Sequence, residues 1–217
     1  MNREIDQTKR GHRGEAERIR SRAGRSVSPL VLMVVSILGT ACAPIWAPID
    51  EKTPRPFPMT TVEMTMDLPI GWMSSYYAPA AGYFFFTVHG QELEEIWIRR
   101  WPKSQIVKGT NRNFAGLMTI QEMANLSIDS RRLDDGVGAL EVVSNRPATV
   151  GGRDCYRLDY RYRNEIGLPK RTVEYGCPVG GWFYRFEFNA PQQFYFDRRL
   201  EDFERMTKTI HFTTKGA

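Results

Sequence analysis

Apolar and polar residues alternate along the chain from Val62 to Leu68. This two-residue repeat is typical of a β-strand that buries one face. Two further stretches, 82–88 and 95–99, are rich in aromatic and β-branched residues and predict two more strands. Because the three segments follow one another with short connections, we expect them to pair as a meander of neighbouring strands.

A similar alternation recurs later in the chain, in residues 155–163, 171–175 and 182–188. Each stretch carries apolar residues on one face and charged residues on the other, and hairpin-length connections join the three, which favours antiparallel pairing. The charged face is either a solvated sheet surface or a docking face, and its mixed sign favours the solvated interpretation. Its residues are Arg157, Asp159, Arg161, Arg163, Arg185 and Glu187.

Two helices are expected between and after the strands. Thr119 and Glu122 have the spacing of a capping box, and apolar residues recur at helical spacing after them. The second helix is predicted to begin near Pro191, a residue type favoured in the first turn, with Phe196 and Phe203 on its apolar stripe. Strands, helix, strands and helix in this order predict an α+β fold around one antiparallel sheet.

The N-terminal segment has a different pattern. Residues 1–25 hold eight Lys or Arg and four acids, and an uncharged, apolar run over residues 29–38 follows. Small residues come next, at 39–41. A basic, an apolar and a small-residue region in this order are typical of a secretory signal, and the apolar run is shorter than the ~20 residues that span a membrane. We therefore predict that residues 1–41 are a signal peptide.

The residues around the predicted cleavage point are Leu38-Gly39-Thr40-Ala41-Cys42. They resemble the lipobox of bacterial lipoproteins, in which the cysteine sulfur receives a lipid and becomes the first residue. The resemblance implies that Cys42 carries several acyl chains, which is what stable anchoring requires. Ala43 is not the acidic residue that often retains such proteins at the inner membrane, so an outer-membrane lipoprotein facing the periplasm is expected. A secreted protein and an inner-membrane anchor are the alternatives.

Removal of the leader changes the charge of the chain. The whole sequence has 30 basic and 25 acidic residues, a net charge of +5. The leader accounts for 8 − 4 = +4 of it, so residues 42–217 keep 22 basic and 21 acidic residues, or +1. Nucleic-acid binding needs a basic stripe on the folded domain, and this balance argues against it.

Residues 42–60 contain five prolines between Pro44 and Pro58. Proline-rich chain is extended and semi-rigid, so this segment is predicted to be a tether between the membrane and the folded part. An N-terminus that packs on the domain surface is the alternative. Residues 61–217 are then a single domain, of a size that buries a core without cross-links.

Four short motifs, taken in order, resemble those of one known group, the Mog1/PsbP-like proteins, and the similarity spans residues 62–212. The resemblance implies an α-β-α sandwich around a central antiparallel sheet, and bacterial members of the group include envelope lipoproteins. It implies no catalytic residue, and roles in nuclear transport or photosynthesis known for other branches are not carried over. The motifs are Leu68-Pro69-Ile70-Gly71-Trp72, Thr119–Glu122, Val150-Gly151-Gly152-Arg153 before a long hairpin, and Thr209-Ile210-His211-Phe212. Gly151-Gly152 in the third motif also predicts a turn.

Candidate catalytic and metal-binding residues are few. Of the three histidines, His12 lies in the leader, and His89 and His211 have no partner at a metal-ligand spacing. The sequence contains no nucleophile-elbow, zinc-protease or phosphate-loop motif. We therefore predict no catalytic residue, no metal and no cofactor.

Two cysteines, Cys155 and Cys177, flank one predicted hairpin and would lie in an oxidising compartment. Their midpoint falls where the turn is expected, so we predict a disulfide between them, with two free thiols as the alternative. One observation opposes this pairing, because it places Leu158 opposite Glu174, where the apolar pattern prefers an apolar partner. A β-bulge near Gly176 would reconcile the two.

The sequence has 12 Phe, nine Tyr and five Trp. Most lie on apolar strand faces, where core packing explains them. Four lie near predicted turns and are candidates for an exposed partner or ligand surface, because aromatic residues are enriched at interfaces. They are Trp72, Tyr76, Tyr77 and Trp101.

Two functions fit these observations. The first is a lipid-anchored, non-enzymatic binding or accessory module of the bacterial cell envelope, which contacts the membrane through its acyl chains and binds an envelope protein or a small ligand. It predicts an exposed aromatic or charged patch and no convergent polar cluster. The second is a membrane-anchored hydrolase acting on envelope polymers, which predicts a cleft with two carboxylates, or a carboxylate and His89, within hydrogen-bond reach. The lack of motifs favours the first.

Overall fold

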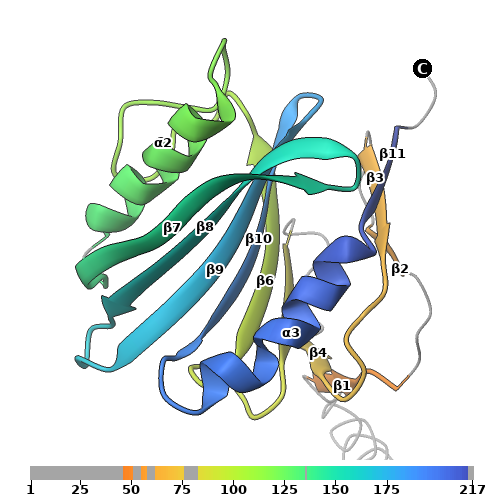
Figure 1. Ribbon diagram of the computed structural model, residues 1–217. Helices are drawn as coiled ribbons and strands as arrows, with labels where there is room; N and C mark the ends of the chain where they lie inside the picture. The colour runs from red at the N-terminus through yellow and green to blue at the C-terminus, as the bar shows by residue number, and fades with distance from the viewer. Residues whose placement is uncertain (1–45, 51–54, 58–61, 76–82, 135, 215–217) are drawn as a thin grey trace, which may run out of the picture. The chain divides into compact units, whose positions relative to one another are not determined.

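The computed structural model describes residues 46–50, 55–57, 62–75, 83–134 and 136–214. Residues 44–217 form one compact unit. Within the described part, its strands form one sheet of eight strands and one of three (Figure 1). Two helices accompany them in the same part of the chain, α2 (Ile120–Arg132) and α3 (Tyr195–Lys208).

The larger sheet has the strand order β1-β4-β5-β6-β10-β9-β8-β7, and its neighbours pair antiparallel. Its second half is a run of long hairpins. The turn between β7 and β8 is the predicted Gly151-Gly152, whose φ angles of +55° and +72° match a tight two-residue hairpin turn. The strands are β1 Trp46–Pro48, β4 Met73–Ser75, β5 Tyr83–Thr87, β6 Glu95–Pro102, β7 Gly138–Val150, β8 Arg153–Arg163, β9 Pro169–Val179 and β10 Trp182–Pro191.

The smaller sheet joins distant parts of the chain. Its order is β11-β3-β2, with β2 Arg55–Phe57, β3 Val62–Met66 and β11 His211–Thr214. The strand predicted over 62–68 therefore exists, but the predicted meander is wrong for it, because β3 pairs with β11 and β2 and not with β5. Alternation specifies which face of a strand is buried and leaves its partner open.

Helix α3 covers one face of the larger sheet. Its Phe196 and Phe203 are fully buried and pack on Phe188 of β10, with ring centroids 5.4 Å and 5.9 Å apart. Met64 and Met66 of β3 belong to the same apolar core. The helix begins at Tyr195, later than predicted, because Pro191 is the last residue of β10.

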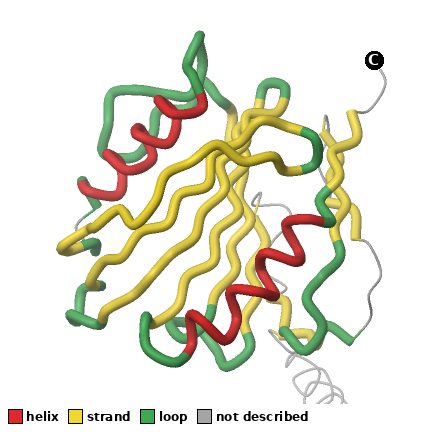
Figure 2. Tube along the Cα trace, in the orientation of Figure 1, coloured by secondary structure: helices red, strands yellow, loops and turns green. Residues whose placement is uncertain are grey.

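Helix α2 packs on the opposite face, against β7 and β8 (Figure 2). The predicted capping box is confirmed, since Glu122 N–H donates to Thr119 Oγ1 (3.2 Å) and Thr119 N–H donates to Glu122 Oε2 (2.7 Å). The second core lies beneath α2 and contains Leu126, Leu158 and Phe183. Two helices on opposite faces of an antiparallel sheet confirm the α+β sandwich.

Part of the segment predicted as a tether is folded. Residues 46–48 are β1, which pairs with β4, and Ile49 is 2% exposed in the larger core. Residues 55–57 are β2. The compact unit therefore begins well before residue 61, and proline is accommodated because these short strands lie at sheet edges. The predicted leader, 1–41, lies outside the described residues.

The late strands are covered on both faces. Of the charged residues interpreted as a solvated surface, Arg157, Asp159 and Glu187 are 8%, 4% and 6% exposed. The solvated interpretation is wrong for these three, because α3 lies over one side of the strands and α2 over the other. Charged residues buried this deeply need partners. Arg157 pairs with Glu204 of α3 and Glu187 with Arg131 of α2, whereas Asp159 pairs with Arg171 of β9.

Cys155 and Cys177 form the predicted disulfide, with their Cα atoms 4.5 Å apart. The bond lies on the α3 face, where both residues are buried. Leu158 does lie opposite Glu174, and Tyr156 lies opposite Gly176. The predicted bulge is not needed, because the partner of Leu158 is a carboxylate that is buried and hydrogen-bonded beneath α2.

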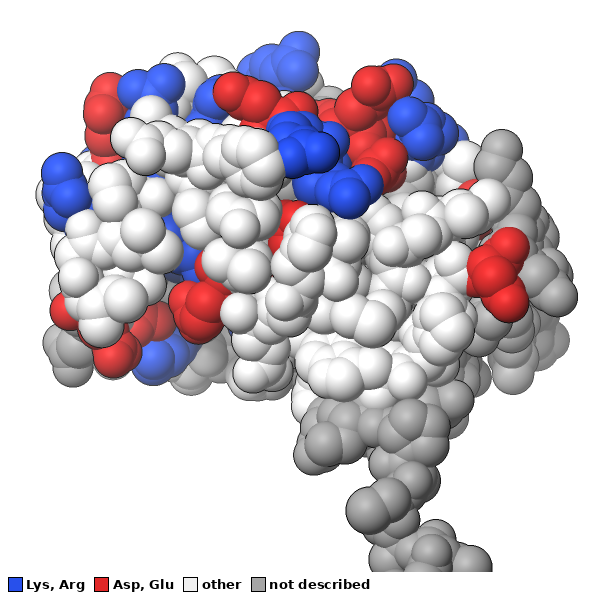
Figure 3. Space-filling view, turned by 90° about the horizontal axis from the view of Figure 1, so that it is seen from below, with Lys and Arg blue, Asp and Glu red and all other residues white. Residues whose placement is uncertain are grey.

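The surface of this unit is unevenly charged. Uncharged side chains dominate the face seen from below in Figure 3, whereas Lys, Arg, Asp and Glu gather mainly along its upper rim and one side. No helix of the described part is long and apolar enough to cross a membrane.

Candidate functional site

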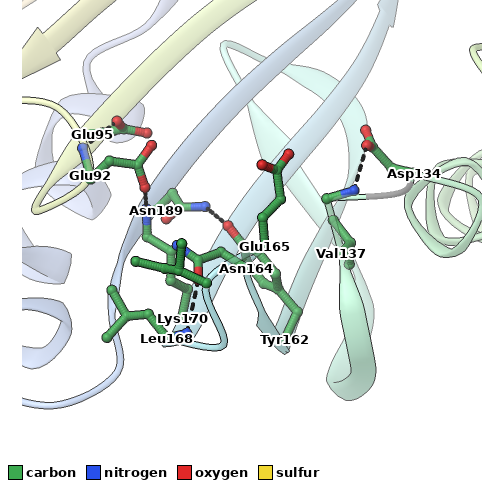
Figure 4. Close-up of a pocket in the computed structure, with 12 residues that line it drawn as sticks. Glu92, Glu95, Asp134, Val137, Tyr162, Asn164, Glu165, Leu168, Lys170 and Asn189 are labelled. Atoms are coloured by element: carbon green, nitrogen blue, oxygen red, sulfur yellow. Dashed lines mark hydrogen bonds and ion pairs between the residues drawn. The ribbon is translucent and has the colours of Figure 1, made fainter.

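A pocket of about 490 Å³ opens at one end of the larger sheet (Figure 4). Its floor is made by Tyr162, Lys170, Asn189 and Glu95, which belong to the four adjacent strands β8, β9, β10 and β6. These four side chains meet because Tyr162 pairs with Lys170, and Asn189 pairs with Glu95, in the strand register. They project from the face of the sheet that α2 covers further along.

Three turns form the walls of this pocket. The β8–β9 turn contributes Asn164, Glu165, Ile166 and Leu168, the segment after α2 contributes Asp134, Gly136 and Val137, and the β5–β6 turn contributes Glu92. Loops held at the end of a rigid sheet are a common place for binding sites. The floor of the pocket is therefore rigid, whereas substitutions in the three turns can change the shape and charge of its walls.

The pocket is acidic. Four carboxylates line it, from Glu92, Glu95, Asp134 and Glu165, against one cation, Lys170. The ordinary charges of these groups sum to −4 + 1 = −3. Partial burial raises the pKa of Asp134, but the Gly136 N–H and the Lys108 ammonium lower it by more. This carboxylate is therefore ionised at neutral pH.

The single lysine in the pocket is already paired. Lys170 is 3% exposed, and its Nζ donates to Glu92 Oε2 at 2.9 Å. Glu92 has a left-handed backbone (φ 73°), and its N–H donates to Glu95 Oε1 at 2.8 Å. A non-glycine residue in this conformation costs energy and needs such support. The three side chains thus hold the β5–β6 turn against the floor.

Tyr162 and Asn189 form the polar centre of the floor. Asn189 Nδ2 donates to Tyr162 Oη at 2.5 Å and to Thr172 Oγ1 at 3.1 Å. Asn189 is 7% exposed, and its Oδ1 has no hydrogen-bond partner among the described residues. Burial raises the pKa of Tyr162 to about 12, against the opposing hydrogen bond from Asn189, so the phenol is neutral at physiological pH.

A buried ionic cluster continues from the pocket along the α2 face. Arg131 of α2 donates through Nη2 to Glu187 Oε2 at 2.6 Å and lies 3.4 Å from Glu174 Oε2. Glu174 is fully buried and also accepts hydrogen bonds from Ser127 Oγ (2.6 Å) and Tyr156 Oη (2.5 Å). We call Arg131, Glu174 and Glu187 the buried triad.

The pKa values in and around the triad are displaced away from neutrality. Burial raises the pKa of Glu187, but Arg131, Arg185 and Arg99 together lower it to about 2. Burial likewise opposes the charge of Arg131, yet Glu187 and its other neighbours hold the pKa of this guanidinium well above its ordinary value. A general acid or base needs a pKa near the working pH. Arg131 and Glu187 are therefore an ion pair and not an acid–base pair.

His89 lies in the β5–β6 turn, with its Nδ1 2.6 Å from Glu94 Oε1. The Glu94 side chain is 1% exposed and that of His89 is 53% exposed. This is the carboxylate–His89 pair that the hydrolase hypothesis predicts. Neither residue lines the pocket of Figure 4. In the described residues there is also no group of three His, Cys, Asp or Glu able to hold a metal ion.

The structure corrects the predicted aromatic surface. Trp72 is 1% exposed, and its Nε1 donates to Asp202 Oδ2 at 3.1 Å, so it is a core residue. Trp101 is half-buried, with its ring 5.3 Å from that of Phe183 and the Arg185 guanidinium 5.0 Å from its centroid. Tyr76 and Tyr77 lie outside the described residues, as does the lipid-attachment residue Cys42.

The residues of the pocket were not predicted from the sequence. Lys170, Thr172 and Glu174 alternate along β9 as a polar set, and Glu187 and Asn189 do so along β10. This alternation of polar residues was visible in the sequence. It indicates a buried polar face only once α2, from a distant part of the chain, is known to cover it.

No protein-family model matches the sequence, and no curated protein matches it. Among solved structures, the chain is similar to the cyanobacterial PsbP protein CyanoP of Synechocystis sp. PCC 6803, with a TM-score of 0.51, 13% identity, and coverage of 77% of this chain and 96% of that one. This likeness shows the fold alone. The described domain has the Mog1/PsbP-like fold that the sequence motifs predicted.

Other solved structures lie somewhat further away. LpqN of Mycobacterium tuberculosis, described as involved in cell envelope biogenesis, has a TM-score of 0.47 at 12% identity over 77% of this chain and 90% of its own. A Mog1 point mutant has a TM-score of 0.47 at 8% identity over 73% and 95%. The chain spans less than half, 46%, of a matched Bacteroides thetaiotaomicron structure, whose TM-score is 0.43 at 14% identity over 71% of this chain.

Proposed function

We propose that the chain is a lipid-anchored, non-enzymatic binding or accessory module of the bacterial cell envelope. The observation that carries the binding role is the pocket of Figure 4, a cavity of about 490 Å³ with convergent polar groups on a rigid sheet. A concave site lined by a few convergent polar groups is the usual form of a ligand site.

The chemistry of the groups near the pocket favours binding over turnover. The pKa of Glu187 is lowered, and the pKa values of Arg131 and Tyr162 are raised, so their protonation states are constant across the physiological range. Of these three residues, Tyr162 lines the pocket and presents a neutral hydroxyl to a ligand, while Arg131 and Glu187 pair with each other beside it. Groups with such pKa values do not act as general acids or bases near neutral pH.

The anchor is proposed from the leader sequence. The basic, apolar and small-residue regions before Cys42 and the lipobox resemblance support export and lipid attachment. The disulfide between Cys155 and Cys177 is in keeping with an oxidising compartment. An outer-membrane position facing the periplasm is part of the same proposal, with a secreted or inner-membrane form as the alternative.

One observation favours the second candidate function, a membrane-anchored hydrolase. His89 and the buried Glu94 have the geometry of a base held by a carboxylate. If this pair is catalytic, purified protein will degrade envelope polymers such as peptidoglycan, and His89→Ala will abolish the activity while His211→Ala retains it. A binding module will show no turnover in any of the three forms.

The anchor is tested by expressing the full chain in a diderm bacterium, separating inner and outer membranes, and measuring the intact mass. We expect a mass that begins at Cys42 and includes acyl chains, in the outer-membrane fraction. The Cys42→Ser form should move to the soluble fraction, because no acceptor sulfur is left. Recovery of wild-type protein that still carries residues 1–41 would overturn the anchor.

A further inference from the structure

We propose that the pocket at the strand ends binds an alkylammonium group, supplied either by a free polyamine or by a lysine side chain of a partner protein. This inference rests on the proposed binding function and adds the chemical class of the ligand. Four features of the pocket point to this ligand class: its charge, an unsatisfied oxygen in its floor, its size and the aromatic ring of Tyr162 in its floor.

The charge of the pocket selects a cation. Its lining carboxylates outnumber its lining cations by three, and the one lysine among them, Lys170, is committed to Glu92 at 2.9 Å. Asp134 pairs with Lys108 outside the lining at 3.3 Å, so Glu95 and Glu165 are the lining carboxylates that form no ion pair with a described residue. Glu165 is exposed on the β8–β9 turn, and Asp134 faces it across the mouth in Figure 4. An incoming cation would relieve the repulsion among these groups, whereas an anion would add to it.

An independent observation points to a hydrogen-bond donor as the ligand. Asn189 lines the pocket, is 7% exposed, and carries an Oδ1 that no described residue satisfies, while its Nδ2 is fully used by Tyr162 and Thr172. A buried polar atom without a partner is costly, and it is rare unless it serves a ligand or a water. An ammonium group supplies three donors and no acceptor.

The size and wall of the pocket favour an organic cation over a metal ion. About 490 Å³ exceeds what a single ion needs, and the described residues contain no group of three His, Cys, Asp or Glu with metal-holding geometry. The ring of Tyr162 in the floor can attract an ammonium as well as support its methylene chain. Leu168 and Val137 offer apolar wall for that chain.

The test uses the intact, lipidated protein purified in detergent and isothermal titration calorimetry. The probes are spermidine, Nα-acetyl-lysine amide and, as an anion of similar size, glutarate. We expect both amines to bind and glutarate to give no heat of binding. Raising NaCl from about 0.05 M to about 0.5 M should weaken amine binding severalfold, because salt screens partly exposed charges.

The variant is Glu165→Gln, because this exposed side chain makes no hydrogen bond or ion pair with another described residue, so its replacement should leave the fold unchanged. It should weaken amine binding about tenfold through loss of one charge-assisted contact. The matched control is Glu201→Gln on α3, which removes one carboxylate that is 85% exposed and distant from the pocket. The control should bind amines like the wild type.

Every outcome decides between the alternatives. Tighter binding of spermidine than of the lysine amide identifies a free polyamine as the source, and equal or tighter binding of the lysine amide identifies a protein side chain. Binding of glutarate in place of the amines overturns the ligand class and leaves the binding function standing. Equal amine affinity in Glu165→Gln and Glu201→Gln also overturns the ligand class, as does the absence of amine binding. The proposed envelope function is tested separately. It fails if the protein keeps residues 1–41 or if it degrades envelope polymers.

Discussion

The two faces of the larger sheet use the same strands in opposite ways. On the α3 face, Phe186 and Phe188 meet Phe196 and Phe203 in the larger apolar core. The buried charges of that face, Arg157 and Asp159, pair with Glu204 and Arg171. On the α2 face, alternate residues of the same strands form an apolar end beneath the helix, then the buried triad, and finally the acidic pocket. Burial of apolar area is the main source of folding free energy, so the α3 face, which has the larger of the two apolar cores, contributes more of it.

The difference has a functional meaning. A buried ion pair seldom stabilises a protein more than apolar residues of the same size would. The α2 face therefore carries polar groups that stability alone does not explain. They lie next to a pocket, and this favours a binding role for that end of the face.

The largest expected effect comes from breaking the triad. Arg131→Met leaves the Glu174 and Glu187 carboxylates buried without their cation and should lower the free energy of unfolding by about 3–5 kcal/mol. Urea unfolding followed by circular dichroism measures it. The exposed neighbour Arg132→Met should change stability by less than about 0.5 kcal/mol. Similar losses for the two arginines would show that the triad is not the critical contact.

The same experiment can be sharpened by replacing the whole triad. Arg131→Met, Glu174→Leu and Glu187→Leu combined should recover most of the stability that Arg131→Met alone loses, because no buried charge is left uncompensated. If the triple variant stays as unstable as the single one, the polar groups of the α2 face are needed for the fold itself.

The second effect is a dependence on pH that belongs to the α2 face. The pKa of Glu187 falls from its ordinary 4.5 to about 2 in the folded chain. A carboxyl group with a lowered folded pKa adds stability above its unfolded pKa, and this is lost as the pH falls through 4.5 towards 2. The loss is on the order of 3 kcal/mol. Urea unfolding between pH 7 and pH 2.5 should show it, and the Glu187→Gln variant should show a flatter profile.

The third effect tests the α3 face. Reduction of the Cys155–Cys177 bond should lower the free energy of unfolding by about 3 kcal/mol, the chain-entropy value for a loop of this length. Both sulfurs are buried, so reduction should require partial unfolding. Unfolding in urea with and without dithiothreitol measures the difference, and the Cys155→Ala, Cys177→Ala double variant should be insensitive to the reductant. A wild-type midpoint that dithiothreitol leaves unchanged would contradict the bond.

The smallest effect concerns the contact between two strands of the α2 face. The Tyr156 ring lies across Gly176, where a Cβ atom would clash with it. Gly176→Ala should displace the ring, weaken the Tyr156–Glu174 hydrogen bond and cost about 1–3 kcal/mol. Gly181→Ala is the control, because a Cβ there meets nothing within 4 Å. Equal stability of the two variants would show that the ring has room to move.

Local patterns predicted most of the elements. The Thr119 cap, the Gly151-Gly152 turn and the alternating strands were all correct, because each depends on residues close in sequence. Paired cysteines around one hairpin also predicted the disulfide. These features share a short range, over which propensity and register decide the structure.

The pocket and the triad could not be predicted in the same way. Arg131 and Glu187 are 56 residues apart, and no pattern in the sequence around either residue predicts that the two are in contact. A charged strand position looks solvated until a distant helix covers it with an opposite charge. The acidic pocket has the same origin, since its walls come from three separate turns that only the strand order brings together.

The unequal lengths of the strand pairings have a mechanical consequence. At the N-terminal edge, β1 and β4 share three paired positions, whereas β9 and β10 share ten. Tension applied through residue 46 would load the short β1–β4 pairing first, and β4 in turn shares only two paired positions with β5. The disulfide-linked half of the sheet would carry load only after β1 and β4 have given way. A chain pulled from its N-terminus therefore has a compliant first strand ahead of a stiff body, which would let the pocket keep its shape while β1 separates from β4.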